Sequence, residues 1–333
     1  METVTCNLCN SSEQRVVYSK PDERYFRDEW FMVVECTNCG LGFVNPRPSR
    51  EEMSRYYPAA YYEYDGLDPD YHQRRYQLEA KVVRDIIPNG AGHRLLDIGC
   101  ANGHFPRQMQ KLGWEVEGVE ISSNSSSISD FKIYSDEFPR IPVDEPRYDA
   151  ITAWAVLEHV HDPMAHFRKA AKILKPGGVF VFLVTNFDSL SSRRLLREDT
   201  PRHLYFFTIE TIRQYLSRNG LVLVAANYDN KIFSMRPVGW LRYYLYRLLG
   251  RTLTWQDIPP NRTEYLAKHQ LQNTLISNLR YLALHPFTVV DRLLMPFYER
   301  WQMLSNSYGT ASYVATKPLR QKATTAGDTS QNC

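Results

Sequence analysis

The 333-residue sequence lacks long apolar runs, a large net charge and an export signal. Its longest apolar runs, at residues 179–184 and 281–290, fall well short of the ~20 residues that a membrane-spanning helix needs. Forty Lys and Arg against 37 Asp and Glu leave a net charge of +3, which argues against a protein whose main partner is a nucleic-acid backbone. The first residues contain neither the basic start nor the apolar stretch of a secretory signal. We therefore expect a cytoplasmic protein that binds no nucleic acid.

Cysteine is scarce, but four of the six cysteines form two pairs with the same internal spacing. These are Cys6, Cys9, Cys36 and Cys39. Disulfides are rare in the cytoplasm, so the four thiolates are available to a metal ion. Four thiolates describe a closed, structural Zn²⁺ site with no open position for catalysis. The long gap between the pairs predicts a hairpin inserted between them.

From residue 94 onward, short apolar runs alternate with helical patterns. Strands are expected at 94–98, 115–119, 131–134, 148–153, 179–185, 221–226 and 312–316, with helices between most of them. Asp162 followed by Pro163 predicts the start of one helix. Such alternation predicts an α/β fold in which a doubly wound parallel sheet has helices on both faces.

The chain divides into five parts by composition. We expect a zinc ribbon at 1–48, a helical and tyrosine-rich linker at 49–92, a main domain at 93–228 with a closing strand in 311–318, a helical insertion at 229–310 and a disordered tail at 319–333. The tyrosines from Tyr56 to Tyr64 are interpreted either as a lid over a site or as interdomain packing. The insertion is basic and aromatic, which suits either a helical cap or dimer contact, or peripheral contact with an anionic membrane.

The strongest chemical signal is the turn after the first strand of the main domain. Asp97 ends that strand, and Gly99, Ala101 and Gly103 follow it, so the backbone can turn tightly and approach a ligand. Glu120 ends the next strand, where a carboxylate can hold both hydroxyls of a ribose. The glycine spacing differs from the G-x-G-x-x-G of dinucleotide sites. A carboxylate ahead of the turn suits an ammonium group better than a phosphate, which favours S-adenosylmethionine.

These motifs together resemble a known family. Residues 94–186 resemble class I S-adenosylmethionine-dependent methyltransferases through LLDIGCANG (95–103), Glu120, YDAITAW (148–154), VLEHV (156–160) and LKPGG (174–178). The paired cysteines with GFVNPRP (42–48) resemble zinc-ribbon-headed methyltransferases associated with sugar and surface-polysaccharide biosynthesis. The resemblance implies a Rossmann-like sheet of seven strands. It also implies that Asp136 contacts the adenine side of the cofactor and that Trp154 lines its methionine end.

Methyl transfer to a hydroxyl benefits from a base that operates near neutral pH, and histidine is the natural choice. His159 follows the fourth strand, and His203 follows the fifth, so both belong at the carboxyl edge of the sheet. We expect His203, then His159, to be catalytic. A structural role is the favoured interpretation for His161, and Asn186 is interpreted as either orienting the acceptor or capping a turn.

The sequence thus predicts an enzyme that transfers methyl groups from S-adenosylmethionine to a hydroxyl or carbon of a sugar-derived or other small-molecule acceptor. A quinone-like or polyketide acceptor is a second possibility. A zinc-ribbon protein that binds and methylates RNA is a third, although residues 1–48 have no concentrated Lys and Arg stripe. A non-catalytic scaffold that binds the cofactor is a fourth.

Overall fold

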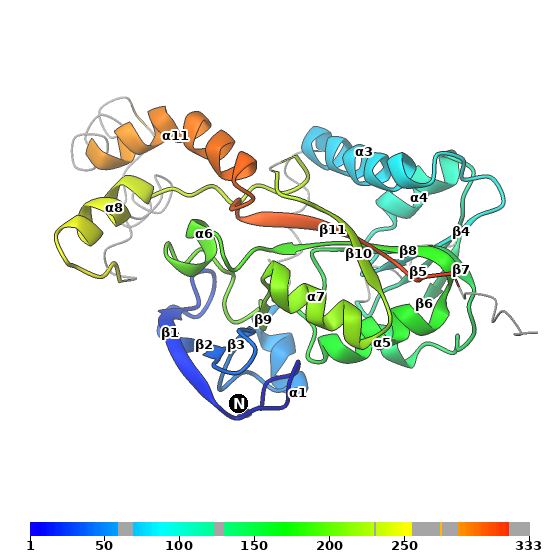
Figure 1. Cartoon of the computed structure of the whole chain (residues 1–333), viewed down its shortest axis with the longest axis horizontal. Helices are drawn as coiled ribbons and strands as arrows, with labels where there is room; N and C mark the ends of the chain where they lie inside the picture. Colours follow the sequence, from blue (N-terminus) through cyan, green and yellow to red (C-terminus); the bar gives the residue numbers. More distant parts are fainter. Residues whose placement is uncertain (59–68, 123–129, 230, 255–273, 275–285, 320–333) are drawn as a thin grey trace, which may run out of the picture.

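The protein folds around two β-sheets, as the computed structural model in Figure 1 shows. The structure describes residues 1–58, 69–122, 130–229, 231–254, 274 and 286–319. The expected disordered tail, apart from Leu319, lies outside these residues, as do Tyr61, Tyr62 and Tyr64 of the expected lid.

The larger sheet has seven strands in the order β10-β11-β8-β7-β4-β5-β6. The bounds are β4 (Arg94–Ile98), β5 (Glu115–Val119), β6 (Lys132–Tyr134), β7 (Tyr148–Trp154), β8 (Leu174–Thr185), β10 (Val222–Asn227) and β11 (Thr310–Thr316). Its neighbours from β6 to β8 pair in parallel, while β11 runs antiparallel to both β8 and β10. The α/β class and the doubly wound sheet are therefore confirmed. The closing strand begins at Thr310 and ends at Thr316, slightly earlier than expected.

Alternate residues of the sheet strands build two separate cores. On β4, Leu95 packs with α3 and α4, while Leu96 belongs to the core that includes α5 and α7. The four helices are α3 (Pro69–Ile86), α4 (His104–Lys111), α5 (Pro163–Ile173) and α7 (Ile209–Arg218). Figure 1 shows α3 and α4 together on one side of the sheet and α5 and α7 on the other. Asp162 caps α5 by accepting a hydrogen bond from the Ala165 N–H, as the sequence predicts.

One strand differs from its prediction. The Lys-Pro-Gly-Gly run was expected to interrupt the chain before residue 179, but β8 already begins at Leu174. The main chain of this run pairs with the segment after β11, since Gly177 N–H donates to the Lys317 carbonyl and Lys317 N–H donates to the Gly178 carbonyl. These two hydrogen bonds keep the run extended, although Gly177 has a φ of +80°.

The N-terminal part of the chain forms the second sheet, in the order β1-β2-β3-β9. The strands are β1 (Gln14–Pro21), β2 (Trp30–Cys36), β3 (Gly42–Val44) and β9 (Tyr205–Phe206). Strands β1 and β2 form the hairpin between the cysteine pairs. The last strand comes from far along the chain and pairs antiparallel with β3. Residues 1–48 therefore share a sheet with the main domain, which the predicted boundary at residue 48 did not anticipate.

Asn7 also joins the N-terminal part to the helices beneath the larger sheet. Its side-chain N–H donates to Asp162 at 2.9 Å, and its side-chain oxygen accepts from the Met164 N–H and the Tyr215 hydroxyl, each at 2.9 Å. A single side chain thus contacts the first turn of α5 and the buried face of α7.

The remaining described helices lie in the linker and the insertion. Ser49 and Glu52 form a capping box at the start of α1 (Arg50–Met53), which continues into the 3-10 helix η1 (Ser54–Tyr56). Short turns form α6 (Leu190–Arg193) and the 3-10 helix η4 (Phe138–Arg140). The insertion contains α8 (Trp240–Leu248) and α11 (Pro286–Leu304), which contact each other at one end of the molecule (Figure 1). Among the described residues, every helix is too short or too polar to cross a membrane.

Candidate active site

A cavity of about 1030 Å³ lies at the carboxyl edge of the larger sheet. The turn after β4, the ends of β5 and β7, and the loops after β7 and β8 all contribute to its wall. Among the predicted site residues, the cavity is lined by Gly99, Ala101, Glu120, Asp136, Trp154, His159 and His203. The topology therefore places the glycine turn and both candidate histidines around one space, as expected for an open α/β sheet.

The turn after β4 has a left-handed backbone conformation that residues with large side chains rarely adopt. Gly99 has a φ of +69°, Ala101 of +45° and Gly103 of +73°, all in the left-handed region. A Cβ on Gly99 would also lie 2.7 Å from Cγ2 of Val156. Gly99 is thus required both by its conformation and by the close approach of the next loop. Gly103 precedes the first turn of α4 and is not part of the cavity wall.

Glu120 fixes the turn to the end of β5. One carboxylate oxygen accepts a hydrogen bond from the Ala101 N–H at 2.9 Å, and the other accepts from the Ser122 N–H at 2.8 Å. The side chain is half-buried and lines the cavity, so it shapes the turn and also faces any ligand in it.

Asp97 lies behind the turn, buried rather than in the cavity wall. Its Oδ1 accepts a hydrogen bond from the Thr152 hydroxyl at 2.6 Å. Burial raises its pKa well above the usual value, and the nearby carboxylate of Glu79 adds to this. Burial also raises the pKa of Glu79 to about 7, although Arg75 donates to it at 2.8 Å. A positively charged group near this turn would favour the ionised form of both acids.

Trp154 and Asp136 complete the cofactor side of the cavity. Trp154 ends β7, is 7% exposed and packs edge-on against Phe105 of α4. Within the described part of the chain, its buried indole N–H has no acceptor. Asp136 follows β6, is exposed to the cavity and accepts from the Glu137 N–H.

His203 forms a close pair with Glu198. Nδ1 of His203 lies 2.6 Å from Oε2 of Glu198, which is 1% exposed. Burial alone would lower the pKa of His203, but the hydrogen bond and the charge of Glu198 outweigh it and raise this pKa. Glu198 also accepts from the hydroxyls of Thr185 and Ser192, which hold the carboxylate in place. The pair leaves Nε2 of His203 as the nitrogen that can exchange a proton with a ligand.

His159 lies beside His203 but has the opposite character. Their ring centroids are 4.6 Å apart with the rings nearly perpendicular. Nδ1 of His159 is within hydrogen-bonding distance of the Tyr57 hydroxyl and the Arg202 carbonyl. Burial and then the positive charge of His203 lower the pKa of His159 to about 3. Neutral His159 therefore suits a positioning role better than that of a base working near neutral pH.

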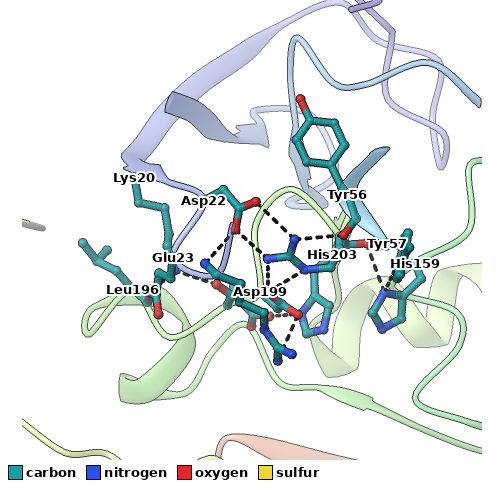
Figure 2. A network of polar contacts seen from close by, with 12 residues as sticks. Lys20, Asp22, Glu23, Tyr56, Tyr57, His159, Leu196, Asp199 and His203 are labelled. Carbon is teal, nitrogen blue, oxygen red and sulfur yellow. Dashed lines mark hydrogen bonds and ion pairs between the residues drawn. The ribbon is translucent and has the colours of Figure 1, made fainter. Parts of the chain in front are cut away.

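The loop that carries His203 is fastened to the N-terminal sheet by buried charges. Arg202, which is fully buried, donates to Asp22 at 2.8 Å, to Asp199 at 2.6 Å and to the Tyr56 carbonyl at 3.2 Å. Lys20, also fully buried, donates to the carbonyls of Leu196 and Glu198 and forms an ion pair with Glu23. Figure 2 shows these groups converging from the end of β1 and from η1 onto the loop that ends in His203. We call this set, Lys20, Asp22, Asp199 and Arg202, the buried clamp.

Two further candidates have structural partners. Nε2 of His161 lies 3.1 Å from the Pro48 carbonyl. Asn186 is buried, donates to the Tyr308 carbonyl and accepts from the Asp188 N–H, so it caps the turn after β8. Both residues hold loops together, in agreement with the interpretation that the sequence favours for His161.

Sequence reasoning missed Glu198, Asp22 and the specific role of Tyr57. A signal was present: Glu198, Asp199 and Arg202 stand between two apolar runs. A charge that becomes buried between such runs needs a partner. The sequence gives no sign, however, that the partner is Asp22, because 180 residues separate it from Arg202.

The four paired cysteines come together in the N-terminal part. Their Sγ atoms all lie within 4.8 Å of one another, with Cys6 to Cys39 at 3.4 Å and Cys9 to Cys36 at 3.5 Å. Tetrahedral coordination at ~2.3 Å places sulfurs roughly 3.8 Å apart, so this set fits Zn²⁺. The two pairs also share one turn geometry, since Asn10 N–H donates to the Cys6 carbonyl as Gly40 N–H does to that of Cys36.

Comparison with known proteins agrees with this geometry. Residues 71–226 match a protein family described as "Methyltransferase domain". The matched residues include the glycine turn, the ends of β5 and β7, and the His203 loop, so this part of the chain is similar to a methyltransferase domain.

Relatives with assigned functions match part of the chain. A ubiquinone biosynthesis O-methyltransferase from Alkalilimnicola ehrlichii is 34% identical over 119 residues, which cover 33% of this chain and 48% of that protein. One from Xanthomonas campestris is 30% identical over 164 residues, covering 43% of this chain and 66% of that protein. The chain thus spans about half to two thirds of the length of these relatives. A methyltransferase structure from Archaeoglobus fulgidus is 18% identical with a TM-score of 0.46, covering 73% of this chain and 94% of that one.

The buried clamp generates the first prediction. Asp22→Asn removes one of the two carboxylates that neutralise buried Arg202, and breaking such a pair typically costs about 3 kcal/mol or more of unfolding free energy. Urea unfolding followed by circular dichroism measures the change. The matched control is Asp28→Asn, at an exposed position of the same hairpin, which should stay within about 0.5 kcal/mol of the parent protein. Equal stability of the two variants would show that Asp22 does not neutralise Arg202.

Proposed function

We propose that this chain transfers a methyl group from S-adenosylmethionine to a hydroxyl group of a small-molecule acceptor, with His203 as the general base. The observation that carries the proposal is one cavity that joins the glycine turn of a methyltransferase domain to a histidine held by a buried carboxylate. The family match supports the reaction type, and the geometry supports the roles of the residues.

The residues around the turn fit S-adenosylmethionine. Gly99 and Ala101, which have no side chain and a single methyl group, line the cavity and leave their backbone accessible to a ligand, and Glu120 offers carboxylate oxygens to the hydroxyls of a ribose. Asp97 and Glu79 beneath the turn favour the amino group and positive charge of the cofactor over the phosphates of a dinucleotide. Asp136 and Trp154 line the remaining wall. When bound, the cofactor supplies a methyl group on a positively charged sulfur, which leaves as a neutral thioether and needs no acid.

His203 accounts for the proton of the acceptor. Nε2 of His203 takes the hydroxyl proton while Glu198 holds Nδ1 and stabilises the imidazolium that forms. Glu158, whose pKa is raised to about 7 by burial despite the charge of His203, lies in the same cluster and adds negative potential once it ionises. Tyr57 and His159 form the neighbouring wall and orient the acceptor. Holding the acceptor in line with the methyl group lowers most of the barrier.

The acceptor that fits best is a phenolic hydroxyl on a quinone-like ring. The relatives with assigned functions are named ubiquinone biosynthesis O-methyltransferases, which supports this class. The cavity is also lined by Met53, Tyr57, Phe233 and Met235, whose apolar and aromatic side chains suit the faces of an aromatic ring. A sugar-derived acceptor is the second candidate, because the paired-cysteine head resembles that of sugar-modifying methyltransferases.

The N-terminal part acts as a structural zinc module in this proposal. Cys6, Cys9, Cys36 and Cys39 would hold Zn²⁺ as four thiolates, which leaves no position for a substrate. Cys36 ends β2, which pairs with β3, and β3 pairs with β9 just after His203. The metal would therefore stabilise the base of the active site without taking part in the reaction.

The cofactor assignment predicts a loss of affinity in Glu120→Ala. Removing a carboxylate that binds ribose hydroxyls and the Ala101 N–H should weaken S-adenosylmethionine binding about tenfold or more, as measured by calorimetry. Glu120→Gln keeps one acceptor oxygen and should lose less. Glu145→Ala, at an exposed position, is the control and should bind like the parent protein. Parent-like affinity in Glu120→Ala would remove Glu120 from the cofactor site.

The base assignment predicts a specific pH profile. Since a base acts in its neutral form and the pKa of His203 is raised, kcat should increase as the pH rises above 6.5 and then reach a plateau. Glu198→Gln removes the charge that raises this pKa, so the rising limb should move to lower pH while kcat falls. His203→Ala should lower kcat about 10²-fold or more with little change in cofactor affinity.

The assay for that profile follows methylation of a soluble catechol, with a nucleotide sugar tested in parallel. His161→Gln is the comparator for His203→Ala and should retain most activity, because His161 contacts the Pro48 carbonyl rather than Glu198. A pH profile that is unchanged in Glu198→Gln would contradict the base assignment. So would activity that a chelator abolishes and Mg²⁺ restores. Methylation of the sugar alone would replace the phenolic acceptor by the second candidate.

The zinc assignment predicts about one zinc per chain in elemental analysis. Cys36→Ser should lose the metal and unfold at a lower temperature, since structural zinc contributes folding free energy directly. Cys333→Ser, at a cysteine that belongs to neither of the two C-x-x-C pairs, should keep both the metal and the stability. A metal-free protein that unfolds at the same temperature with and without added zinc would refute the assignment.

A further inference from the structure

Helix α11 exposes a continuous apolar stripe. The stripe consists of Phe287, Val290, Leu294, Phe297, Trp301 and Leu304, all exposed, at alternating steps of three and four residues. Phe297 is 75% and Leu304 is 77% exposed, and Leu293 beside the stripe is 70% exposed. The opposite side of the helix is buried against the protein through residues such as Asp291 and Met295. Such spacing places the apolar side chains along one face of the helix.

The charges around the stripe have one sign. In residues 231–254 and 286–308, which the structure describes, the acidic residues are Asp291 and Glu299, and both are buried. Asp291 accepts from the Gly239 and Leu241 N–H groups at the start of α8, and Glu299 accepts from the Tyr308 hydroxyl. The exposed charged residues of α8 and α11 are all arginines, namely Arg247, Arg292 and Arg300. Arg251, shortly after α8, is also exposed.

Helices α8 and α11 adjoin the cavity. Residues 233–236, shortly before α8, line the cavity, and so does Thr310, shortly after α11. Trp240 of α8 stacks on Tyr298 of α11 with centroids 4.5 Å apart, which ties the two helices together. Figure 1 shows them side by side at the end of the molecule away from β4, β5 and β6. A surface that binds this pair would therefore lie beside the entrance for an acceptor.

We propose that α8 and α11 dock the protein on an anionic lipid surface. The apolar stripe enters the boundary between headgroups and acyl chains, while the exposed arginines contact anionic headgroups. Pairing with a second copy through the same face is disfavoured, because it would bring the arginines of two chains together, and residues 231–254 and 286–308 offer no exposed acid to neutralise them. The inference deepens the proposed function: docking would bring the cavity to an acceptor dissolved in a membrane.

Binding of the whole protein to vesicles tests the proposal. We expect it to cosediment with vesicles of phosphatidylcholine and phosphatidylglycerol, and much less with phosphatidylcholine alone or at high salt. Phe297→Ser combined with Leu304→Ser should weaken binding about tenfold or more, because both side chains would otherwise be buried in lipid. Arg292→Glu combined with Arg300→Glu should weaken it by a similar factor on the anionic vesicles only.

The control variants replace the same kinds of exposed residue on other elements of the protein. Val222→Ser combined with Val224→Ser alters exposed apolar residues of β10, and Arg84→Glu alters an exposed arginine of α3; both should bind vesicles like the parent protein. Turnover of a soluble acceptor should be unchanged in the Phe297 and Leu304 variant, so a failed reaction and failed docking are distinguishable. Equal binding to neutral and anionic vesicles, or none to either, would overturn the proposal. So would a dimer in sedimentation that this variant dissociates.

Discussion

The structure depends on one buried ionic interaction, that of Arg202 with Asp22 and Asp199. Burying a guanidinium is costly unless carboxylates and hydrogen bonds replace its water. Here one carboxylate comes from the N-terminal sheet and the other from the same loop as Arg202. Arg202 has both carboxylate partners only when the N-terminal sheet is packed against this loop. The position of His203, the next residue, therefore depends on that packing.

The two halves of the cavity are built by different means. The half proposed to bind the cofactor follows directly from parallel strands, whose carboxyl ends bring the turn after β4 and Glu120 together. The acceptor half has no regular element of its own. Its histidines come from loops after β7 and β8, and these loops are held by contacts of Tyr57, Lys20 and Arg202 together with the short pairing of β9 with β3. The N-terminal sheet thus replaces the regular scaffold that the second half lacks.

The same arrangement gives two neighbouring histidines different tendencies to bind a proton. His203 gains a carboxylate partner and has a raised pKa, while His159 has a hydroxyl and a carbonyl as partners and has a pKa lowered to about 3. When His203 is protonated, its charge disfavours a second proton on His159. One ring is therefore suited to accept a proton and the other to stay neutral against the acceptor.

The sequence by itself determined the features that depend on local spacing. The alternation of strands and helices, the bent turn at Gly99, the strand end at Glu120, the cap at Asp162 and the two cysteine pairs all follow from short patterns of neighbouring residues. Only the tertiary structure decided which groups neutralise the buried charges and which distant strands pair with each other. Glu198 beside His203, Asp22 beside Arg202 and β9 beside β3 join segments whose contact no periodicity encodes. The physical reason is that such contacts are selected by desolvation and chain closure of the whole molecule, which act only after the local elements have packed.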